Sequence, residues 1–283
     1  MSWMKSFFGK SSNIAQKVKG NKFVPSLGGQ LEDRKLLATV TASAGSYTVI
    51  VSEINNRKVK SDGNIVATLK FNSTTIKSNI PVAISDLKYE SSPSVAINVS
   101  GQFVVAYHAT DNGFVKHFPG IQLKVFNNKG IATYIDDQVA KSSPDSVTNP
   151  VVGINSKGNA ILAYASTNEK GSNVQAVQYN YTTSGIFSSY TKKNVTVVSM
   201  PWIVIPTSVG ITPSGKWAMV YTFQAKSTDV DVYAYVSTGT TYTVANTLEQ
   251  ERNGIVNFFT DERLAVSYIS GKESLWKIKS LKL

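Results

Sequence analysis

The sequence predicts an all-β fold, a β-propeller of five blades whose last blade is incomplete. A hairpin motif occurs five times, with reference residues at Tyr47, Phe103, Ala160, Trp217 and Leu264. Successive copies are 56, 57, 57 and 47 residues apart, and a fixed period near this length is typical of propeller-like arrays. The chain also ends soon after the fifth copy, which leaves room for only one further strand. The alternatives to a propeller are an open array of β-repeats and a β-sandwich.

Each copy of the motif contains a strand, a tight turn and a second strand. Gly101, Gly158 and Gly215 stand in three of the turns, where a positive φ is accessible to glycine without steric cost. The second strand is an almost unbroken apolar run, such as FVVAY at residues 103–107, and such runs are typical of strands buried on both faces. We therefore expect the second strands to be the inner strands of the blades.

The remaining strands follow polar loops. Third strands are expected at residues 64–72, 121–127, 174–180, 230–237 and 275–283, and fourth strands at 75–84, 131–139, 187–198 and 242–248. The fifth copy lacks a fourth strand, so the prediction is 19 strands. Its open edge could be tolerated through Lys277, Lys279 and Lys282 or covered by a strand from residues 20–27, and the sequence leaves both alternatives open.

Composition narrows the possible chemistry. Of the 283 residues 42% are hydrophobic and 17% charged, which indicates a folded protein and not a disordered one. The chain has no cysteine and only two histidines, His108 and His117. Disulfides and thiolate zinc sites are therefore excluded, two histidines argue against a multi-histidine metal site, and we expect no metal or cofactor. The basic residues are mostly scattered lysines, so we expect no nucleic-acid binding. No stretch approaches the ~20 apolar residues of a transmembrane helix.

Residues 1–37 differ from the rest of the chain. They hold seven basic and two acidic residues, and Pro25, Gly28 and Gly29 interrupt any regular structure. An apolar stretch of about 7–15 residues, which a secretory signal peptide needs, is not found there. We expect a basic leader or sorting segment at 1–37 and a β-propeller-like repeat domain at 38–283.

The string LEDRKLL at residues 31–37 resembles the L-E-P/D-R-x-L-L signature near the N-terminus of planctomycete-type exported surface proteins. The opening MSWMKSFFGK is similar to the segment that precedes the signature in those proteins. Residues 93–107 (PSVAINVSGQFVVAY) also look like the propeller-like repeats of exported bacterial surface proteins. The resemblance implies a secreted or cell-surface protein. The sorting residues that it implies are Leu31, Glu32, Asp33, Arg34, Leu36 and Leu37.

Polar side chains follow the second strands, where the loops of neighbouring copies should emerge on one face of the ring. Such a rim suits weak binding of a carbohydrate or a peptide, and solvation of the loops is the alternative interpretation. Trp202 and Trp217, by contrast, are expected in the core or between blades. The candidate ligand-binding residues are Glu53, His108, Asp111, Asn168, Glu169 and Gln224.

Two functions from different classes remain. A glycoside hydrolase on a five-bladed propeller would need at least two carboxylates on inner strands. The second-strand motifs contain no Asp or Glu, and Asp136 and Asp137 would point to opposite faces of a strand. We therefore expect no enzyme but a secreted or cell-surface binding or scaffolding module, with a carbohydrate or a surface protein as partner. The alternative is a polysaccharide-active glycoside hydrolase.

Overall fold

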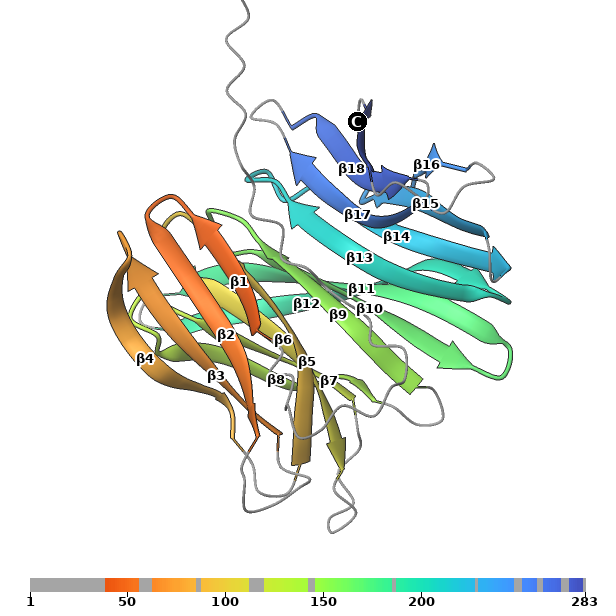
Figure 1. The fold of residues 1–283 in the computed structure, drawn as a ribbon. Coiled ribbons are helices and arrows are strands. Elements are labelled where there is room, and N and C mark those ends of the chain that lie inside the picture. Colours follow the sequence, from red (N-terminus) through yellow and green to blue (C-terminus); the bar gives the residue numbers. More distant parts are fainter. Residues whose placement is uncertain are drawn as a thin grey trace, which may run out of the picture. The chain divides into compact units, whose positions relative to one another are not determined.

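Nineteen strands and no helix make up the part of the chain that the structure describes (Figure 1). The computed structural model describes residues 39–55, 63–84, 88–111, 120–141, 146–184, 187–226, 229–246, 251–258, 262–270 and 275–281. The leader with its sorting motif, and the segment 20–27, lie outside these residues. Within these ranges there is no helix long and apolar enough to cross a membrane.

The strands form five sheets in chain order. The first sheet contains β1 (Thr39–Ala44), β2 (Tyr47–Asn55), β3 (Gly63–Phe71) and β4 (Thr74–Ala83). The second contains β5 (Lys88–Ile97), β6 (Phe103–Asp111), β7 (Gly120–Phe126) and β8 (Ala132–Lys141). The third contains β9 (Ser146–Ile154), β10 (Ala160–Asn168), β11 (Gly171–Ser184) and β12 (Phe187–Met200). The fourth contains β13 (Ile203–Ile211), β14 (Trp217–Lys226), β15 (Asp229–Val236) and β16 (Thr241–Ala245). The fifth contains β17 (Glu251–Phe258), β18 (Leu264–Ser270) and β19 (Leu275–Leu281).

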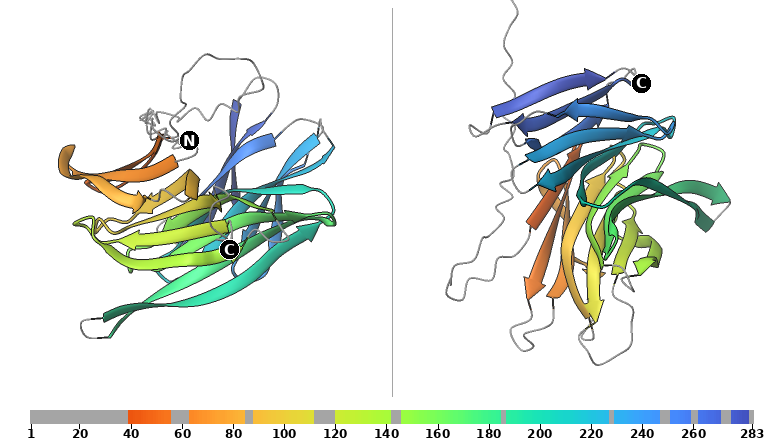
Figure 2. Two further views of the ribbon diagram at one scale, coloured as in Figure 1. Left: turned by 90° about the horizontal axis from the view of Figure 1, so that it is seen from below. Right: turned by 90° about the vertical axis from the view of Figure 1, so that its right-hand side faces the viewer.

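Each sheet is an antiparallel meander in which every strand pairs with the next one along the chain. Four sheets have four strands, and among the described residues the fifth has three. These sheets are the blades of a β-propeller, and the views in Figures 1 and 2 show them following one another along the chain. The predicted fold class is confirmed, and the described residues contain the predicted 19 strands, three of them in the last blade.

The first strand of each blade is the innermost, and the expectation that the second strands are innermost is wrong. β1, β5, β9, β13 and β17 contact one another in succession. The second strands lie one position further out, between the first and third strands. Neighbouring sheets cover them on both faces, so that every residue of 160–166 in β10 is buried. An unbroken apolar run therefore indicates burial on both faces, not distance from the centre.

Four apolar clusters hold the blades together, one between each pair of successive sheets. Alternating side chains of a strand serve different clusters: Ile161 packs toward the fourth blade and Leu162 toward the second. Burial of large apolar side chains contributes roughly 1.5–3 kcal/mol each, so these interfaces dominate the stability of the fold. The clusters draw members from both facing blades, such as Val49 and Phe103, Leu123 and Leu162, Ile161 and Met219, and Val220 and Leu264.

The tight turns of neighbouring blades are joined by hydrogen bonds at equivalent positions. Asn98 Nδ2 donates to the carbonyl oxygen of Asn155 (2.9 Å), and Asn155 Nδ2 donates to that of Thr212 (2.8 Å). Lys216 Nζ lies 3.4 Å from Glu262 Oε2 and so connects the turns of the fourth and fifth blades. The turn ends of blades two to five therefore lie side by side. The glycines in the turns of blades two to four have φ of +82°, +86° and +92°, which confirms the predicted positive φ.

Candidate active site

The ends of the blades opposite the tight turns also lie on one side, because the turns themselves adjoin. At this end each first strand begins and each second strand ends. Four buried carboxylates lie here, Glu53 near the end of β2, Glu90 near the start of β5, Asp231 near the start of β15 and Glu251 at the start of β17. We call it the carboxylate end.

Glu90 and Glu251 occupy the same position of the repeat on two innermost strands. Glu90 pairs with Ala109 and Glu251 with Ser270, and both partners lie six residues after the reference residue of their motif. Only 3% of Glu90 and none of Glu251 is exposed. The structure thus places one carboxylate at an equivalent height on the second and on the fifth blade.

The third and fourth blades show what this position holds when no carboxylate is present. Val147 pairs with Ser166 in the third blade, and Val204 pairs with Phe223 in the fourth. Both valines are buried. Because valine fills the same position, packing between the blades does not require a glutamate there.

Glu53 and Glu90 face the same interface, between the first and second blades. Glu53 lies two residues after Val51 on β2 and therefore on the same face of the strand. Glu90 pairs with Ala109, and both Val51 and Ala109 belong to the cluster that these blades share. Tyr107 lies in that cluster too. Burial, and after it the charge of Glu90, raises the pKa of the Tyr107 hydroxyl. Acidic groups therefore approach one blade interface from both sides at the carboxylate end.

The six candidate ligand-binding residues also lie at the carboxylate end, at the ends of second strands. The expectation that they occupy loops is wrong for most of them, since only Glu169 lies in a turn and the other five belong to strands. Glu53 does not belong to an exposed rim, because only 7% of it is exposed. The six residues are Glu53 in β2, His108 and Asp111 in β6, Asn168 at the end of β10, Glu169 after it, and Gln224 in β14.

His108 is half-buried on β6, between Ser91 of β5 and Ile121 of β7. Burial lowers the pKa of its imidazole below the ordinary 6.5. The side chain is therefore neutral at pH 7, when it can accept a proton or a hydrogen bond but contributes no positive charge.

At this end, Trp202 differs from its prediction, and Asp231 was not among the predicted site residues. Trp202, expected in the core, is 52% exposed, whereas Trp217 is buried at 2% as expected. Asp231 pairs with Phe223 and so lies level with Val204 of the same blade. The signal that could have found Glu90 and Glu251 is the alignment of the first strands with one another, which sets them against two valines.

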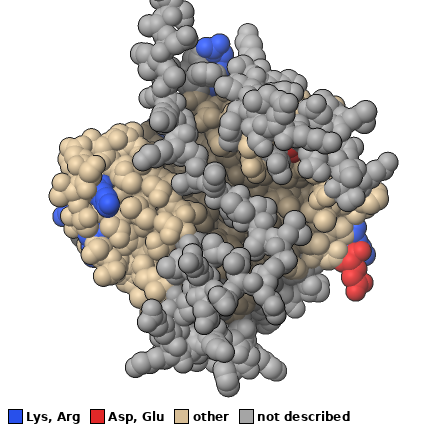
Figure 3. All heavy atoms as spheres, viewed as in Figure 1, with Lys and Arg blue, Asp and Glu red and all other residues tan. Residues whose placement is uncertain are grey.

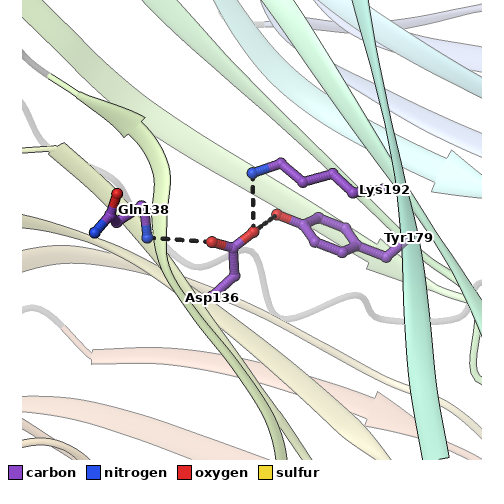
Figure 4. A network of polar contacts seen from close by, with 4 residues as sticks. All are labelled: Asp136, Gln138, Tyr179 and Lys192. Carbon is purple, nitrogen blue, oxygen red and sulfur yellow. Dashed lines mark hydrogen bonds and ion pairs between the residues drawn. The ribbon is translucent and has the colours of Figure 1, made fainter.

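Asp136 is not at the carboxylate end and serves to join the outer strands of the second and third blades (Figure 4). Its Oδ2 accepts from the Tyr179 hydroxyl at 2.9 Å and from Lys192 Nζ at 3.0 Å, while its Oδ1 accepts from the backbone N–H of Gln138 at 3.1 Å. Asp137, the next residue on β8, is exposed. In the described ranges no group of three acidic or histidine side chains could hold a metal ion.

No protein-family model and no curated protein matches the chain. Solved structures match it at low identity. A Dyadobacter fermentans protein of unknown function has a TM-score of 0.55 and 11% identity, covering 87% of this chain and 79% of that one. The PL25 polysaccharide lyase, an ulvan lyase, has a TM-score of 0.50 and 12% identity, covering 87% and 64%. An endo-arabinase from Bacteroides thetaiotaomicron has a TM-score of 0.44 and 14% identity, covering 83% and 89%.

The chain spans 64% of the length of the lyase and 53% of that of a microbial sialidase that it also matches. At these identities the likeness shows the fold alone. The names of these proteins describe their own activities.

The expectation of a non-enzymatic binding or scaffolding module is wrong. It depended on inner strands without Asp or Glu, whereas the innermost strands β5 and β17 carry Glu90 and Glu251. One solved structure with this kind of fold, the ulvan lyase, is itself an enzyme named for action on a glycan. The expectation that the chain is not an enzyme has therefore lost its basis.

Proposed function

We propose that this protein is a glycan-cleaving enzyme of the glycoside hydrolase type, in which Glu90 and Glu251 supply the acid and base groups. The observation that carries the proposal is their equivalent placement on two innermost strands, at a position where the third and fourth blades have Val147 and Val204.

Burying a carboxylate is costly, because the group loses its hydration. Packing does not explain the two buried glutamates, because valine fills the same position in two other blades. Hydrolysis of a glycosidic bond would explain them, since it needs two carboxyl groups. One protonates the oxygen of the leaving sugar, while the other takes a proton from the attacking water or itself attacks the anomeric carbon.

We infer that the substrate is a neutral polysaccharide. The face drawn in Figure 3 shows few charged side chains on the described residues. Four of the acidic residues at the carboxylate end, Glu53 among them, are buried and do not add to the surface charge. Asn168 and Gln224 contribute amides near the surface there, next to the exposed Glu169 and Lys170, and amides suit hydroxyl recognition.

Reducing-sugar release from a polysaccharide panel tests the proposal. The panel includes arabinan and ulvan, the substrates after which two of the matched structures are named. We expect Glu90→Gln and Glu251→Gln each to lower kcat by about 100-fold or more. Asp137→Asn, which removes an exposed carboxylate on β8, should change kcat less than about twofold by comparison.

Circular dichroism and thermal melting show whether each variant is folded, and Glu90→Asp, which keeps the charge but moves it, replaces Glu90→Gln if that variant unfolds. The proposal fails if the wild-type chain cleaves no glycan of the panel, or if turnover survives both glutamine substitutions. Products that carry an unsaturated sugar would assign lyase chemistry and contradict the hydrolase type.

We also propose that the protein is exported, on the strength of the motif at residues 31–37 and its likeness to a sorting signature. Changing Arg34, Leu36 and Leu37 together to alanine should retain the protein inside the cell. Cell fractionation with an antibody to the repeat domain measures this. Finding the unaltered full-length chain only in the cytosol would contradict the proposal.

A further inference from the structure

Trp202 is more exposed to solvent than most tryptophans in folded proteins are. Its exposed fraction is 52%, and Ile203 beside it is 53% exposed. Pro201 is exposed as well. Tryptophan is mostly buried in folded proteins because its large apolar ring is costly to hydrate. An exposed indole with two exposed apolar neighbours therefore calls for an explanation other than packing within the blade.

The segment that carries Trp202 joins the third blade to the fourth at the carboxylate end. β12 ends at Met200 and β13 begins at Ile203. Ile203 pairs with Gln224 at the end of β14. The indole thus lies between the last strand of one blade and the innermost strand of the next, on the side of the molecule that carries the proposed active site.

The turn after β10 packs directly against this segment. A Cβ placed on Gly171 would lie only 2.7 Å from Pro201 Cα and would also collide with the carbonyl of Met200. Glycine is therefore required for the close approach. The contact fixes the turn of Asn168 and Glu169 beside the tryptophan, and Asn168 Oδ1 shapes that turn by accepting from the backbone N–H of Lys170 at 2.9 Å.

The geometry points to a sugar-binding platform at Trp202, in which the indole face stacks on the C–H face of one sugar ring and Gln224 provides hydrogen bonds to its hydroxyls. An aromatic face with a few polar groups at its edge is the usual composition of a small-ligand site. This inference deepens the proposed function and rests on it for the class of ligand. The platform lies on blades three and four, whereas Glu90 and Glu251 lie on blades two and five.

The size of the apolar surface favours a sugar over a protein partner. The exposed apolar row consists of residues 201–203, and the exposed Ser199 and Glu169 stand near it. A stable protein interface buries about 800 Å² on each partner, far more than one indole and its two neighbours provide. One sugar ring, by contrast, is covered by one indole.

A platform away from the cleaved bond should affect binding and not the chemical step. Interactions that are equally strong in the ground state and the transition state change KM but leave kcat. We therefore expect Trp202→Ala to raise KM about tenfold or more for a polysaccharide substrate, with kcat at saturation changed less than about twofold. Trp202→Phe keeps an aromatic face and should restore most of the affinity.

Binding is measured without turnover, in the full-length chain carrying Glu90→Gln, by affinity electrophoresis in gels containing the individual polysaccharides of the panel. Trp202→Ala in this background should lose about tenfold or more of the affinity, and Trp202→Phe about threefold or less. Ile135→Ala is the matched control, because Ile135 is 56% exposed on β8, in another blade, and it should leave retardation unchanged.

The outcomes separate this inference from the proposed function. Retardation that is the same with and without Trp202 overturns the platform, whether or not the wild-type chain cleaves glycans. Retardation that depends on Trp202, in a chain that cleaves nothing, supports the platform and defeats the proposed enzyme. If Trp202→Ala instead abolishes self-association measured by light scattering and leaves retardation unchanged, the exposed row is a protein interface and the platform is wrong.

Discussion

At the scale of single residues, the tight turns show that the same backbone conformation is reached in two ways. Gly101, Gly158 and Gly215 have positive φ, and in the fifth blade Glu262 takes the equivalent place with φ of 61°. Lys216, in the turn of the neighbouring blade, forms an ion pair with that glutamate at 3.4 Å. Hydrogen bonds from the same turn, above all from Ser214, lower the pKa of the Glu262 carboxyl. The loss of glycine in this turn thus accompanies a contact with the turn before it.

Alanine substitutions at two of the glycines separate backbone strain from crowding. Gly215→Ala adds a methyl group with no other atom within 4 Å, so we expect only the cost of a positive φ, about 1–2 kcal/mol. Gly101→Ala would bring Cβ within 2.7 Å of Tyr47 Cε1 and 2.9 Å of Asn128 Cβ. Gly101→Ala should therefore lower the free energy of unfolding by about 1–3 kcal/mol more than Gly215→Ala does, because it overpacks the site. Denaturant unfolding of the two variants measures the difference, and equal losses would show that the Tyr47 ring moves aside freely.

At the scale of elements, the turn between the first two strands of a blade is stabilised from within and also binds the next blade. Asn155 Oδ1 accepts from the backbone N–H groups of Lys157 and Asn159, both at 3.0 Å, and its Nδ2 donates to Thr212 O of the fourth blade. Inner strands are linked in a similar way, since Ser208 Oγ accepts from the N–H of Val256 in the next blade at 3.2 Å. Local turn chemistry and blade-to-blade docking thus use the same side chains.

Asn155→Ala should therefore lower the free energy of unfolding by more than the loss of the hydrogen bonds within its own turn. Asn155 is 4% exposed, and leaving buried polar groups without their partner costs about 1–3 kcal/mol beyond the turn bonds. Asn127→Ala is the control, because Asn127 Oδ1 makes the same two turn bonds, at 2.9 and 3.0 Å, between the outer strands β7 and β8. Unfolding midpoints that fall equally for both variants would mean that the bond to Thr212 contributes nothing.

At the scale of the whole molecule, the repeats supply the apolar interfaces between the blades. The described members of the four clusters lie between residues 40 and 268. Removal of residues 1–37 should therefore shift the melting temperature by less than about 2 °C, because a loss of 1 kcal/mol corresponds to roughly 2–4 °C in a protein of this size. Differential scanning calorimetry of the full chain and of residues 38–283 makes the comparison. A markedly lower melting temperature without the leader would favour the alternative in which residues 20–27 cover the edge of the last blade.

The sequence by itself determined the number of blades, the 19 strands of the described residues and the conformation of the turns, because these are local properties repeated at a fixed period. Gly158 needs its positive φ whatever surrounds it, and the run of residues 160–166 is buried wherever two blades meet around it. Strand ends within the repeat were found to within a few residues for the same reason.

Only the tertiary structure decided which strand of each blade is innermost and what it carries. A strand covered on both faces is more apolar than one that faces the centre. The apolar runs therefore indicate the second strands and not the innermost strands, such as β5 and β17. The equivalence of Glu90 and Glu251 depends on strand register, which is known only from their pairing with Ala109 and Ser270. The exposure of Trp202 was likewise beyond the sequence, because whether an indole is covered depends on how two successive blades meet.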